Sequence, residues 1–462
     1  MRRLFLAAFA LGSAVAVVSA FVPLSVDEAS WLAVERKMAL GRELYVDVID
    51  NKAPPVFFLV RGLDLLPGPF EPVRGVLVGL LAALLALVTF DVADRCGIGR
   101  RRALIAGAAV ALGACVASAL SLTIEMVAIA FVMAGVAFAA RDRPILSATA
   151  SLGIAFDPRA IVLLPGVALV AASRSWRGAR TSLLAMGLVA GALAASLVHP
   201  DLRFGLIELN LASRGASWSA GELGISAARA LILPIVAVFA AWNIEGVQQQ
   251  RPGPRAALVG LVFGVPAVAV VVASLLPFDK YWVLLLPAVP FVIGVRAAAA
   301  RASAAVPLVI GLLVLALAPG AIQTVRVARD RASRLDAYRR VASILEDRLP
   351  EGATFVQFDA NPFLVAELPE SASDPSPLLG LLALPTSRQD AFVSRIRSAL
   401  GNADAVVDDG GLEASPEDVS TSLRPIRDLF VASLDAFPCS ARVEHITVRF
   451  RPHLCPSTEG TS

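Results

Sequence analysis

Residues 25–55 read SVDEASWLAVERKMALGRELYVDVIDNKAPP and form a polar stretch between two apolar runs, 4–23 and 73–93. Each run has about the 20 apolar residues that a membrane-spanning helix needs. The whole chain of 462 residues is 57% hydrophobic and only 17% charged, whereas soluble proteins carry about 25% charged residues. This composition excludes a large soluble enzyme and predicts a polytopic α-helical membrane protein. The net charge of +3 gives no support for nucleic-acid binding.

Further apolar runs of spanning length follow the polar stretch. The longer run 144–173 is interrupted at residues 156–159, so we interpret it as two short helices that form a hairpin. Residues 56–66 are too short to cross a membrane and predict an interfacial helix. With the hairpin, the runs predict about eleven crossings. The single runs are 4–23, 73–93, 103–121, 124–140, 180–198, 225–243, 256–276, 281–298 and 304–323.

The arginine residues predict on which side each loop lies. Loops rich in Lys and Arg stay on the cytoplasmic side, and every second loop is basic if the N-terminus is inside. The C-terminal part then lies outside. Residues 1–20 have an alternative interpretation as a cleaved signal peptide, which leaves the placement of the later helices unchanged. The inner basic positions are Arg2, Arg3, Arg95, Arg100, Arg101, Arg102, Arg141, Arg143, Arg174, Arg177, Arg180, Arg251, Arg255, Arg296 and Arg301.

Residues 326–462 differ from the rest and predict a small extracytoplasmic α/β domain. They carry 15 basic and 20 acidic residues, whereas residues 1–325 carry 26 basic and 18 acidic residues. Cys439 and Cys455 both fall in this outer region, where the environment is oxidising, so we predict a disulfide between them. The expected elements are helices over 331–348 and 387–400 and strands over 354–358, 405–407 and 443–450.

The polar stretch belongs to the predicted first outer loop, residues 24–70, and contains a series of short motifs. An acidic pair follows the first crossing, and a helix then runs to a glycine that suits a helix C-terminus. A Tyr-x-Asp and a Lys-x-Pro-Pro follow before the chain enters the membrane again. The motif residues are Asp27, Glu28, Gly41, Tyr45, Asp47, Lys52, Pro54 and Pro55.

This order and spacing resemble the GT-C superfamily of polytopic glycosyltransferases, especially the branch of protein O-mannosyltransferases and aminoarabinose transferases. Ala53 replaces the first proline of the triplet that is usual in that branch. The broken hairpin, the crossing with Pro287 and Pro290, and the outer α/β tail fit the same pattern. The resemblance implies a GT-C-like transmembrane module over 1–325 and an outer domain over 326–462.

The resemblance also implies a function. Such an enzyme takes a sugar from a polyprenyl-phosphate donor and transfers it, with inversion, to an acceptor hydroxyl at the outer face. The expected location is the bacterial cytoplasmic (inner) membrane, where the lipid bilayer holds the donor, and the activity serves the cell envelope. The acceptor is a glycan, a lipid or a protein, and the motifs leave both the sugar and the acceptor open.

Two carboxylates match the catalytic part of the pattern. Asp27 is the candidate general base, because a hydroxyl nucleophile must lose its proton in the transition state. Glu28 is a second catalytic candidate. For Glu28 there is a structural alternative: Ser25-x-x-Glu28 fits a capping box at the start of the helix.

Cations are expected at the departing lipid phosphate. Lys52, Arg159, Lys280 and Tyr281 are the candidates for contact with it. Each of the three cations has a structural alternative: a snorkelling lysine at the membrane interface for Lys52, or a local ion pair with a neighbouring carboxylate for Arg159 and Lys280. Asp157 is that neighbour for Arg159, and Asp279 for Lys280.

Other positions are expected to support the reaction. Asp47, Tyr45 and Arg203 are candidates for acceptor placement or structural support, and Asp47 is a candidate partner of Lys52. Glu125 lies in a short outer turn where relatives carry an acidic residue, which leaves open a divalent metal such as Mg²⁺ or Mn²⁺. Capping of the following helix is the alternative role for Glu125.

A second class of function is a transporter or flippase for a lipid-linked or small solute. Such proteins usually contain repeats with matching broken helices. This sequence has one broken hairpin without a matching partner, and its polar residues collect at one face of the membrane. The sequence therefore favours the glycosyltransferase.

Overall fold

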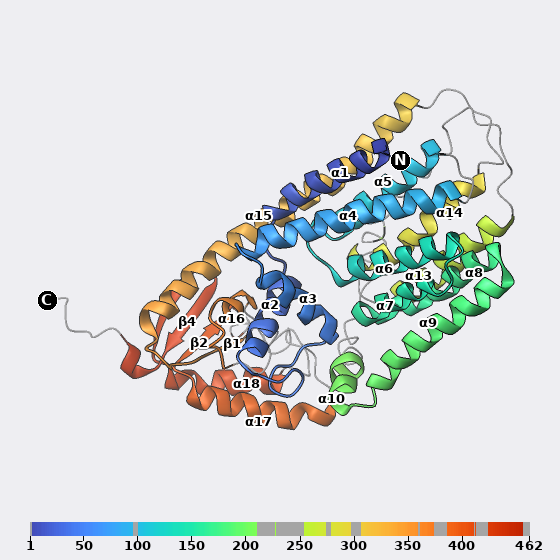
Figure 1. Ribbon diagram of the computed structural model, residues 1–462. Helices are drawn as coiled ribbons and strands as arrows, with labels where there is room; N and C mark the ends of the chain where they lie inside the picture. Colours follow the sequence, from blue (N-terminus) through green and yellow to red (C-terminus); the bar gives the residue numbers. More distant parts are fainter. Residues whose placement is uncertain are drawn as a thin grey trace. The chain divides into compact units, whose positions relative to one another are not determined.

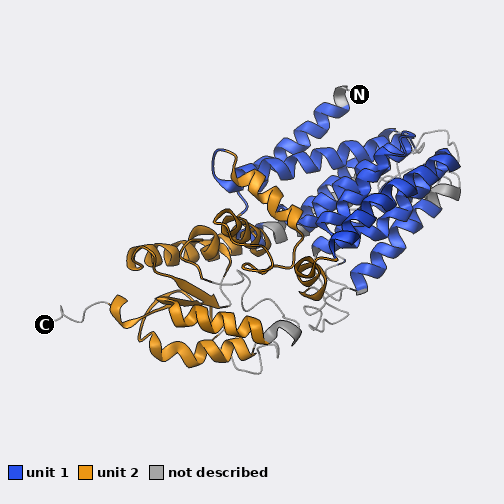
Figure 2. Cartoon of the chain, turned by 60° about the horizontal axis from the view of Figure 1, so that its bottom comes forward, with its two compact units in different colours: residues 1–22, 67–197, 216–329 blue, residues 23–66, 198–215, 330–462 orange. Residues whose placement is uncertain are grey.

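The computed structural model describes residues 2–95, 100–209, 227, 254–273, 279–296, 306–358, 361–373, 386–410, 412 and 424–455. The chain divides into two compact units (Figure 2). Unit 1 contains residues 1–22, 67–197 and 216–329, and unit 2 contains residues 23–66, 198–215 and 330–462. The tail thus shares a unit with the first outer loop and with a short later segment, whereas the sequence led us to expect two continuous domains.

Unit 1 is helical (Figure 1). Its helices are α1 (Arg2–Ala20), α4 (Phe70–Arg95), α5 (Arg100–Ala117), α6 (Ile124–Ala140), α9 (Trp176–Ser196), α13 (Pro254–Ala273) and α14 (Val289–Arg296). Helices α1 and α4 lie side by side. Gly12 and Gly79 allow this approach, because a Cβ atom on Gly12 would lie 2.6 Å from the Gly79 carbonyl oxygen. Small residues let apolar helices approach as closely as membrane helices do.

Two described helices, Phe70–Arg95 and Trp176–Ser196, are long and apolar enough to cross a membrane. Five shorter apolar helices accompany them within the described residues. The predicted run 225–243 lies outside those residues apart from residue 227. The expected number of about eleven crossings therefore stays a prediction from the sequence.

The hairpin is broken where the sequence predicted. It consists of η1 (Leu146–Ala148), α7 (Thr149–Phe156), η2 (Pro158–Leu163) and α8 (Leu164–Arg174). Asp157 is extended (φ −132°, ψ 105°) and accepts a hydrogen bond from the Arg159 N–H at 3.0 Å. A residue before proline is disfavoured in the helical region, and the Asp157 side chain caps the next segment.

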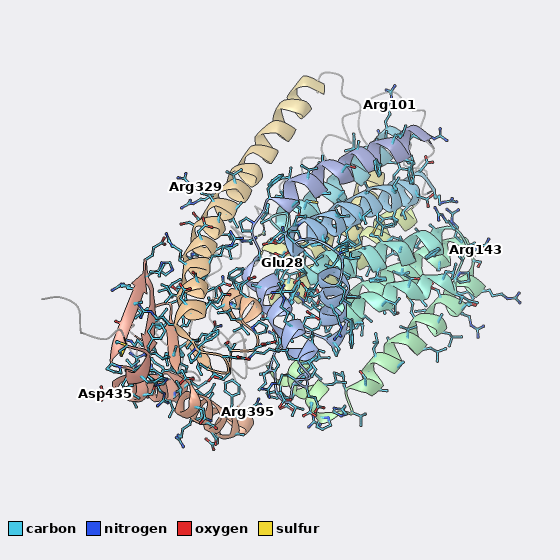
Figure 3. The ribbon with its side chains drawn as sticks, turned by 60° about the vertical axis from the view of Figure 1, so that its left-hand side comes forward. Glu28, Arg101, Arg143, Arg329, Arg395 and Asp435 are labelled. Atoms are coloured by element: carbon cyan, nitrogen blue, oxygen red, sulfur yellow. A yellow bond between two sulfur atoms is a disulfide. The ribbon has the colours of Figure 1, made fainter. Side chains whose placement is uncertain are left out.

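Several arginine-rich loops of unit 1 meet at one end of its helices. Arg141 Nε lies 3.1 Å from Asp91 Oδ2, and Arg174 Nη2 donates to the Arg95 carbonyl at 3.1 Å. Figure 3 shows Arg101 and Arg143 at this end as well. The described loops that carry these arginines thus share one end of the unit, and their placement on the cytoplasmic side stays a prediction.

Unit 2 contains a four-stranded sheet with the order β1-β2-β4-β3. Strands β1 (Phe355–Phe358) and β2 (Ala405–Asp408) are parallel, and β4 (Ile446–Phe450) pairs antiparallel with both β2 and β3 (Cys439–Val443). The α/β prediction for the tail is confirmed. The last strand expected over 443–450 is present as β4, but it begins at Ile446, because Glu444 has φ +56° and lies in the turn that joins β3 and β4 into a hairpin.

Unit 2 also contains helices besides the last part of the helix that ends at Arg348. They are α2 (Val26–Ala39), α3 (Pro54–Asp64), α10 (Pro200–Arg203), η3 (Phe204–Glu208), α16 (Phe363–Glu367), α17 (Thr386–Asn402), α18 (Arg424–Ser433), η6 (Leu434–Ala436) and η7 (Pro452–Leu454). The core joins Val356 and Phe358 of the sheet to Ile396 of α17, and it includes Ile49 from the first outer loop. The loop is therefore part of the hydrophobic core of this unit.

A continuous helix leads into the tail, and a disulfide links two parts of it. Helix α15 (Val306–Arg348) has 43 residues and covers residues 306–323 of the predicted crossing 304–323 together with the predicted tail helix 331–348, which we expected as separate helices. Residues 324–330 contain no glycine or proline to interrupt it. The predicted disulfide is present, and it joins Cys439 at the start of β3 to Cys455 after η7.

Candidate functional site

The first group of candidate residues surrounds the start of α2 in unit 2. The Ser25 N–H donates to Glu28 Oε2 at 2.8 Å, and the Glu28 N–H donates to Ser25 Oγ at 3.2 Å. This confirms the capping box, and Glu28 is only 1% exposed. The preceding side chain, Asp27, is partly exposed. Glu28 thus has a structural role here, and Asp27 is the more accessible carboxylate of the pair.

Asp50 was not among our sequence-based candidates, but it lies at the centre of this group. It is 1% exposed, accepts a hydrogen bond from Ser30 Oγ at 2.8 Å and accepts one from the Lys52 N–H at 2.9 Å. Burial raises the pKa of the Asp50 carboxyl, the charge of Lys52 opposes this shift, and the charge of Asp27 adds to it. These interactions define a loop cluster of Asp27, Ser30, Asp50 and Lys52.

Tyr45 holds the loop that carries this cluster. Its backbone adopts φ +66°, its hydroxyl donates to the Lys52 carbonyl, and its ring packs against Gly205. Burial raises the pKa of the buried Tyr45 phenol. Lys52 Nζ donates to Asn51 Oδ1 at 2.6 Å. The carboxylate that interacts with Lys52 is Asp50, whereas the sequence had suggested Asp47.

Asp47 and Arg203 lie elsewhere in unit 2. Asp47 Oδ2 accepts a hydrogen bond from the Glu43 N–H at 2.9 Å, which closes a tight turn. Arg203 Nε lies 3.4 Å from Glu208 Oε1, and the arginine side chain is 59% exposed. Neither contact includes a residue of the loop cluster, so their expected supporting roles stay predictions.

A second group of candidates lies at the break of the hairpin in unit 1. Glu125 is in the first turn of α6, which Thr123 caps, and it is 1% exposed. Arg159 Nη2 lies 2.7 Å from Glu125 Oε1, and Arg159 Nε lies 2.8 Å from Asp157 Oδ1. The local ion pair considered for Arg159 is therefore present, and Glu125 is a second partner that the sequence did not indicate.

Lys280 and Tyr281 on η5 (Asp279–Ala288) complete this second group. The Arg159 guanidinium lies 3.6 Å from the centre of the Tyr281 ring, which is cation–π distance. Lys280 Nζ lies 6.0 Å from the same ring centre. Arg159, Lys280, Tyr281 and Glu125 thus come together, and with Asp157 we call them the hairpin cluster.

The hairpin cluster is a poor match for a metal site. Among the described residues there is no group of three or more His, Cys, Asp or Glu side chains that could hold a metal ion. One oxygen of Glu125 and one of Asp157 are engaged by Arg159, and the positive charge between them opposes a cation. A divalent metal at Glu125 stays an untested expectation, and the residues present do not favour it.

The fold of this chain is similar to that of solved structures. The crystal structure of ArnT from Cupriavidus metallidurans bound to undecaprenyl phosphate matches with a TM-score of 0.63. The match covers 98% of this chain and 99% of ArnT at 17% sequence identity. This chain has the ArnT fold. The predicted resemblance to the aminoarabinose transferase branch of GT-C proteins is thereby confirmed for the fold.

Other comparisons agree with the ArnT match. ArnT in the apo state gives a TM-score of 0.55 at 16% identity, with coverage of 97% and 99%. The arabinofuranosyltransferase AftD from Mycobacteria gives 0.53 at 15% identity, and the match covers 98% of this chain but only 40% of AftD. No protein-family model and no curated protein matches the sequence. The relationship to ArnT is therefore visible in the fold.

Proposed function

We propose that this protein is a membrane glycosyltransferase that uses a polyprenyl-phosphate sugar. The observation that carries the proposal is the full-length likeness to ArnT, which was solved with undecaprenyl phosphate. The sequence motifs of the first outer loop support it independently, because they were recognised in the sequence without reference to the fold. The proposed location is a bacterial cytoplasmic membrane, with the tail outside.

The hairpin cluster is the proposed contact for the donor phosphate. Arg159 and Lys280 supply positive charge beside Tyr281, and a departing lipid phosphate needs such charge. The carboxylates of Glu125 and Asp157 fix the guanidinium on two sides, so that little reorganisation is needed when the donor binds. Lys52 of the loop cluster is a further proposed phosphate contact.

Asp27 is the proposed general base. The acceptor hydroxyl oxygen forms a bond to the anomeric carbon of the sugar, and the bond from that carbon to the phosphate oxygen breaks. Asp27 accepts the hydroxyl proton, and the polyprenyl phosphate leaves with the electron pair. Attack opposite the leaving phosphate inverts the anomeric centre. The buried Asp50 is proposed to position Lys52, because its carboxyl group accepts a hydrogen bond from the Lys52 N–H and interacts with the Lys52 charge.

The test is transfer by the purified full-length protein with polyprenyl-phosphate sugars in lipid vesicles. A mixture of cell-envelope glycans and lipids serves as acceptor. Asp27→Asn should lower the rate by about a hundredfold or more, as expected for loss of a general base. Glu43→Gln, at an exposed position of the same loop, is the matched control and should keep the rate. Equal rates for Asp27→Asn and the wild type would contradict the role of Asp27.

A further inference from the structure

Unit 2 contains two adjoining cavities of about 160 Å³ and 310 Å³, which neither cluster uses. Both are lined by Lys37, Arg42, Asp47 and Ala372. The smaller cavity also meets Arg395 of α17, and the larger one meets Glu370. We call the two cavities together the basic pocket. All of its lining residues belong to unit 2.

The walls of the basic pocket are held by backbone hydrogen bonds. On one side, the Phe355 N–H of β1 donates to the Ser371 carbonyl at 2.8 Å, and the Ser373 N–H donates to the Phe355 carbonyl at 2.9 Å. These bonds fix Ala372 along the edge of the sheet. Backbone hydrogen bonds to β1 therefore hold the part of the pocket wall that follows α16.

A second part of the wall is held by Arg395 of α17, which Figure 3 labels. Its Nη1 donates to the Val46 carbonyl at 2.5 Å, and its Nη2 donates to the Asp47 carbonyl at 2.7 Å. The guanidinium therefore ties the first outer loop to the tail. A pocket whose wall is held at two places loses little conformational entropy when a ligand binds.

Positive charge exceeds negative charge around the basic pocket. Lys37, Arg42 and Arg395 supply three cations, and Lys37 is only 4% exposed. Asp47 and Glu370 supply two carboxylates. The Asp47 carboxylate accepts a hydrogen bond from the Glu43 N–H, and the Glu370 side chain is exposed. A ligand with both an anionic group and hydroxyls would match this mixture.

We propose that the basic pocket binds a sugar residue that carries a phosphate or a carboxylate, as part of the acceptor. The larger cavity alone reaches the lower end of the usual range for small-molecule sites, about 300–1,000 Å³. The described lining residues are mostly polar or charged and belong to unit 2, so the pocket suits a hydrophilic acceptor. The assignment to the acceptor rests on the proposed glycosyltransferase function.

The experiment measures binding to the full-length protein in detergent by isothermal titration calorimetry. The probes are glucose 1-phosphate, glucuronate, glucose and inorganic phosphate. At least one of the two anionic sugars should bind about tenfold or more tightly than glucose, the size of effect that a charge-assisted hydrogen bond gives. Which of the two binds decides between a phosphate and a carboxylate.

Variants connect that binding to the pocket. Arg42→Gln, at an exposed position, should weaken binding of the preferred anionic sugar by about tenfold. Arg397→Gln, an exposed arginine on α17 that does not line the pocket, is the matched control and should leave the affinity unchanged. Glu370→Gln should strengthen binding by about twofold to fivefold, because it removes a repelling charge. A gain of affinity cannot come from misfolding.

Three results would overturn the proposal. The first is that neither anionic sugar binds better than glucose. The second is that Arg42→Gln and Arg397→Gln have the same affinity for the preferred sugar. The third is that inorganic phosphate binds as tightly as glucose 1-phosphate, which would show a simple anion site. Because these measurements need no turnover, their failure is separable from failure of the Asp27→Asn transfer test.

Discussion

Arg159 Nη2 lies 2.7 Å from Glu125 Oε1, although 34 positions separate the two residues in the sequence. The contact fastens the break of the hairpin to the first turn of α6. Asp157 is the second carboxylate on the same guanidinium, and both carboxylates are 1% exposed in their side chains. One arginine is therefore paired with two buried carboxylates.

This arrangement predicts that substitutions of Arg159 and of Glu125 lower the stability of the fold by unequal amounts. Arg159→Met leaves two buried carboxylates without a cation, and removal of one partner from a buried pair costs about 3–5 kcal/mol. Glu125→Gln leaves Arg159 still paired with Asp157 and should cost less. The measurement is the melting temperature of the full-length protein in detergent. Arg101→Met, at an exposed position of α5, is the control and should melt as the wild type does; equal losses for the first two variants would contradict the prediction.

The buried Asp50 carboxyl predicts a pH dependence of stability. Burial raises its pKa, so the folded protein binds the proton more tightly than the unfolded chain does. The stability that protonation contributes is complete below the unfolded pKa of about 4. It is lost as the pH rises through the raised folded pKa. Buried Glu35, whose pKa burial also raises, acts in the same direction.

The check is the melting temperature as a function of pH. From about pH 4 upward, the wild type should lose stability more steeply than Asp50→Asn, whose side chain does not titrate. Glu43→Gln, at an exposed position, should follow the wild-type curve. Parallel curves for Asp50→Asn and the wild type would show that Asp50 does not titrate in this range.

The contact between Gly205 and Tyr45 predicts intolerance of a side chain. A Cβ atom at position 205 would overlap the Tyr45 ring, so Gly205→Ala should destabilise unit 2 by about 1–3 kcal/mol. The matched control is Gly187→Ala in α9, where no atom lies within 4 Å of the added Cβ. Alanine at this helix position should be neutral or stabilise by up to about 1 kcal/mol. Thermal melting measures both variants, and equal effects would refute the packing argument.

The disulfide between Cys439 and Cys455 predicts a redox-dependent stability of the tail. The bridge spans 16 positions, and closing a loop of this size stabilises by about 3 kcal/mol in the chain-entropy description. Cys439→Ser with Cys455→Ser should make the tail more sensitive to limited proteolysis. Addition of a reductant should bring the wild type to the same sensitivity, while the buried Cys115→Ala should not alter it. Equal resistance of the double variant and the oxidised wild type would contradict this prediction.

Local features were predictable from the sequence because neighbouring residues determine them. The Ser25–Glu28 capping box lies within one helical turn, and Gly41 takes φ +84° directly after α2. The break at Asp157-Pro158 follows from the restriction that proline places on its neighbour. The start of the last expected strand, at residue 443, was misplaced. The turn at Glu444 depends on how β3 and β4 pair, which the sequence pattern did not indicate.

Part of the candidate site's membership was predictable from the sequence, but Asp50 and the pairings of the side chains were not. The motifs of the first outer loop gave Asp27 and Lys52, and the broken hairpin gave Arg159. Nothing in the spacing indicated that Asp50 is buried or that Glu125 binds Arg159. Burial and ion pairing depend on which segments pack together, and that depends on free energy summed over the whole fold.

By itself, the sequence determined an apolar helical chain with a polar outer loop, a broken hairpin and an α/β tail, because hydrophobic periodicity and capping act over a few residues. Only the tertiary structure decided that this loop belongs to the same compact unit as the tail, with Ile49 in its core and Arg395 on its backbone. Contacts between residues some 350 positions apart leave no local pattern, since they form only when distant apolar faces are buried together.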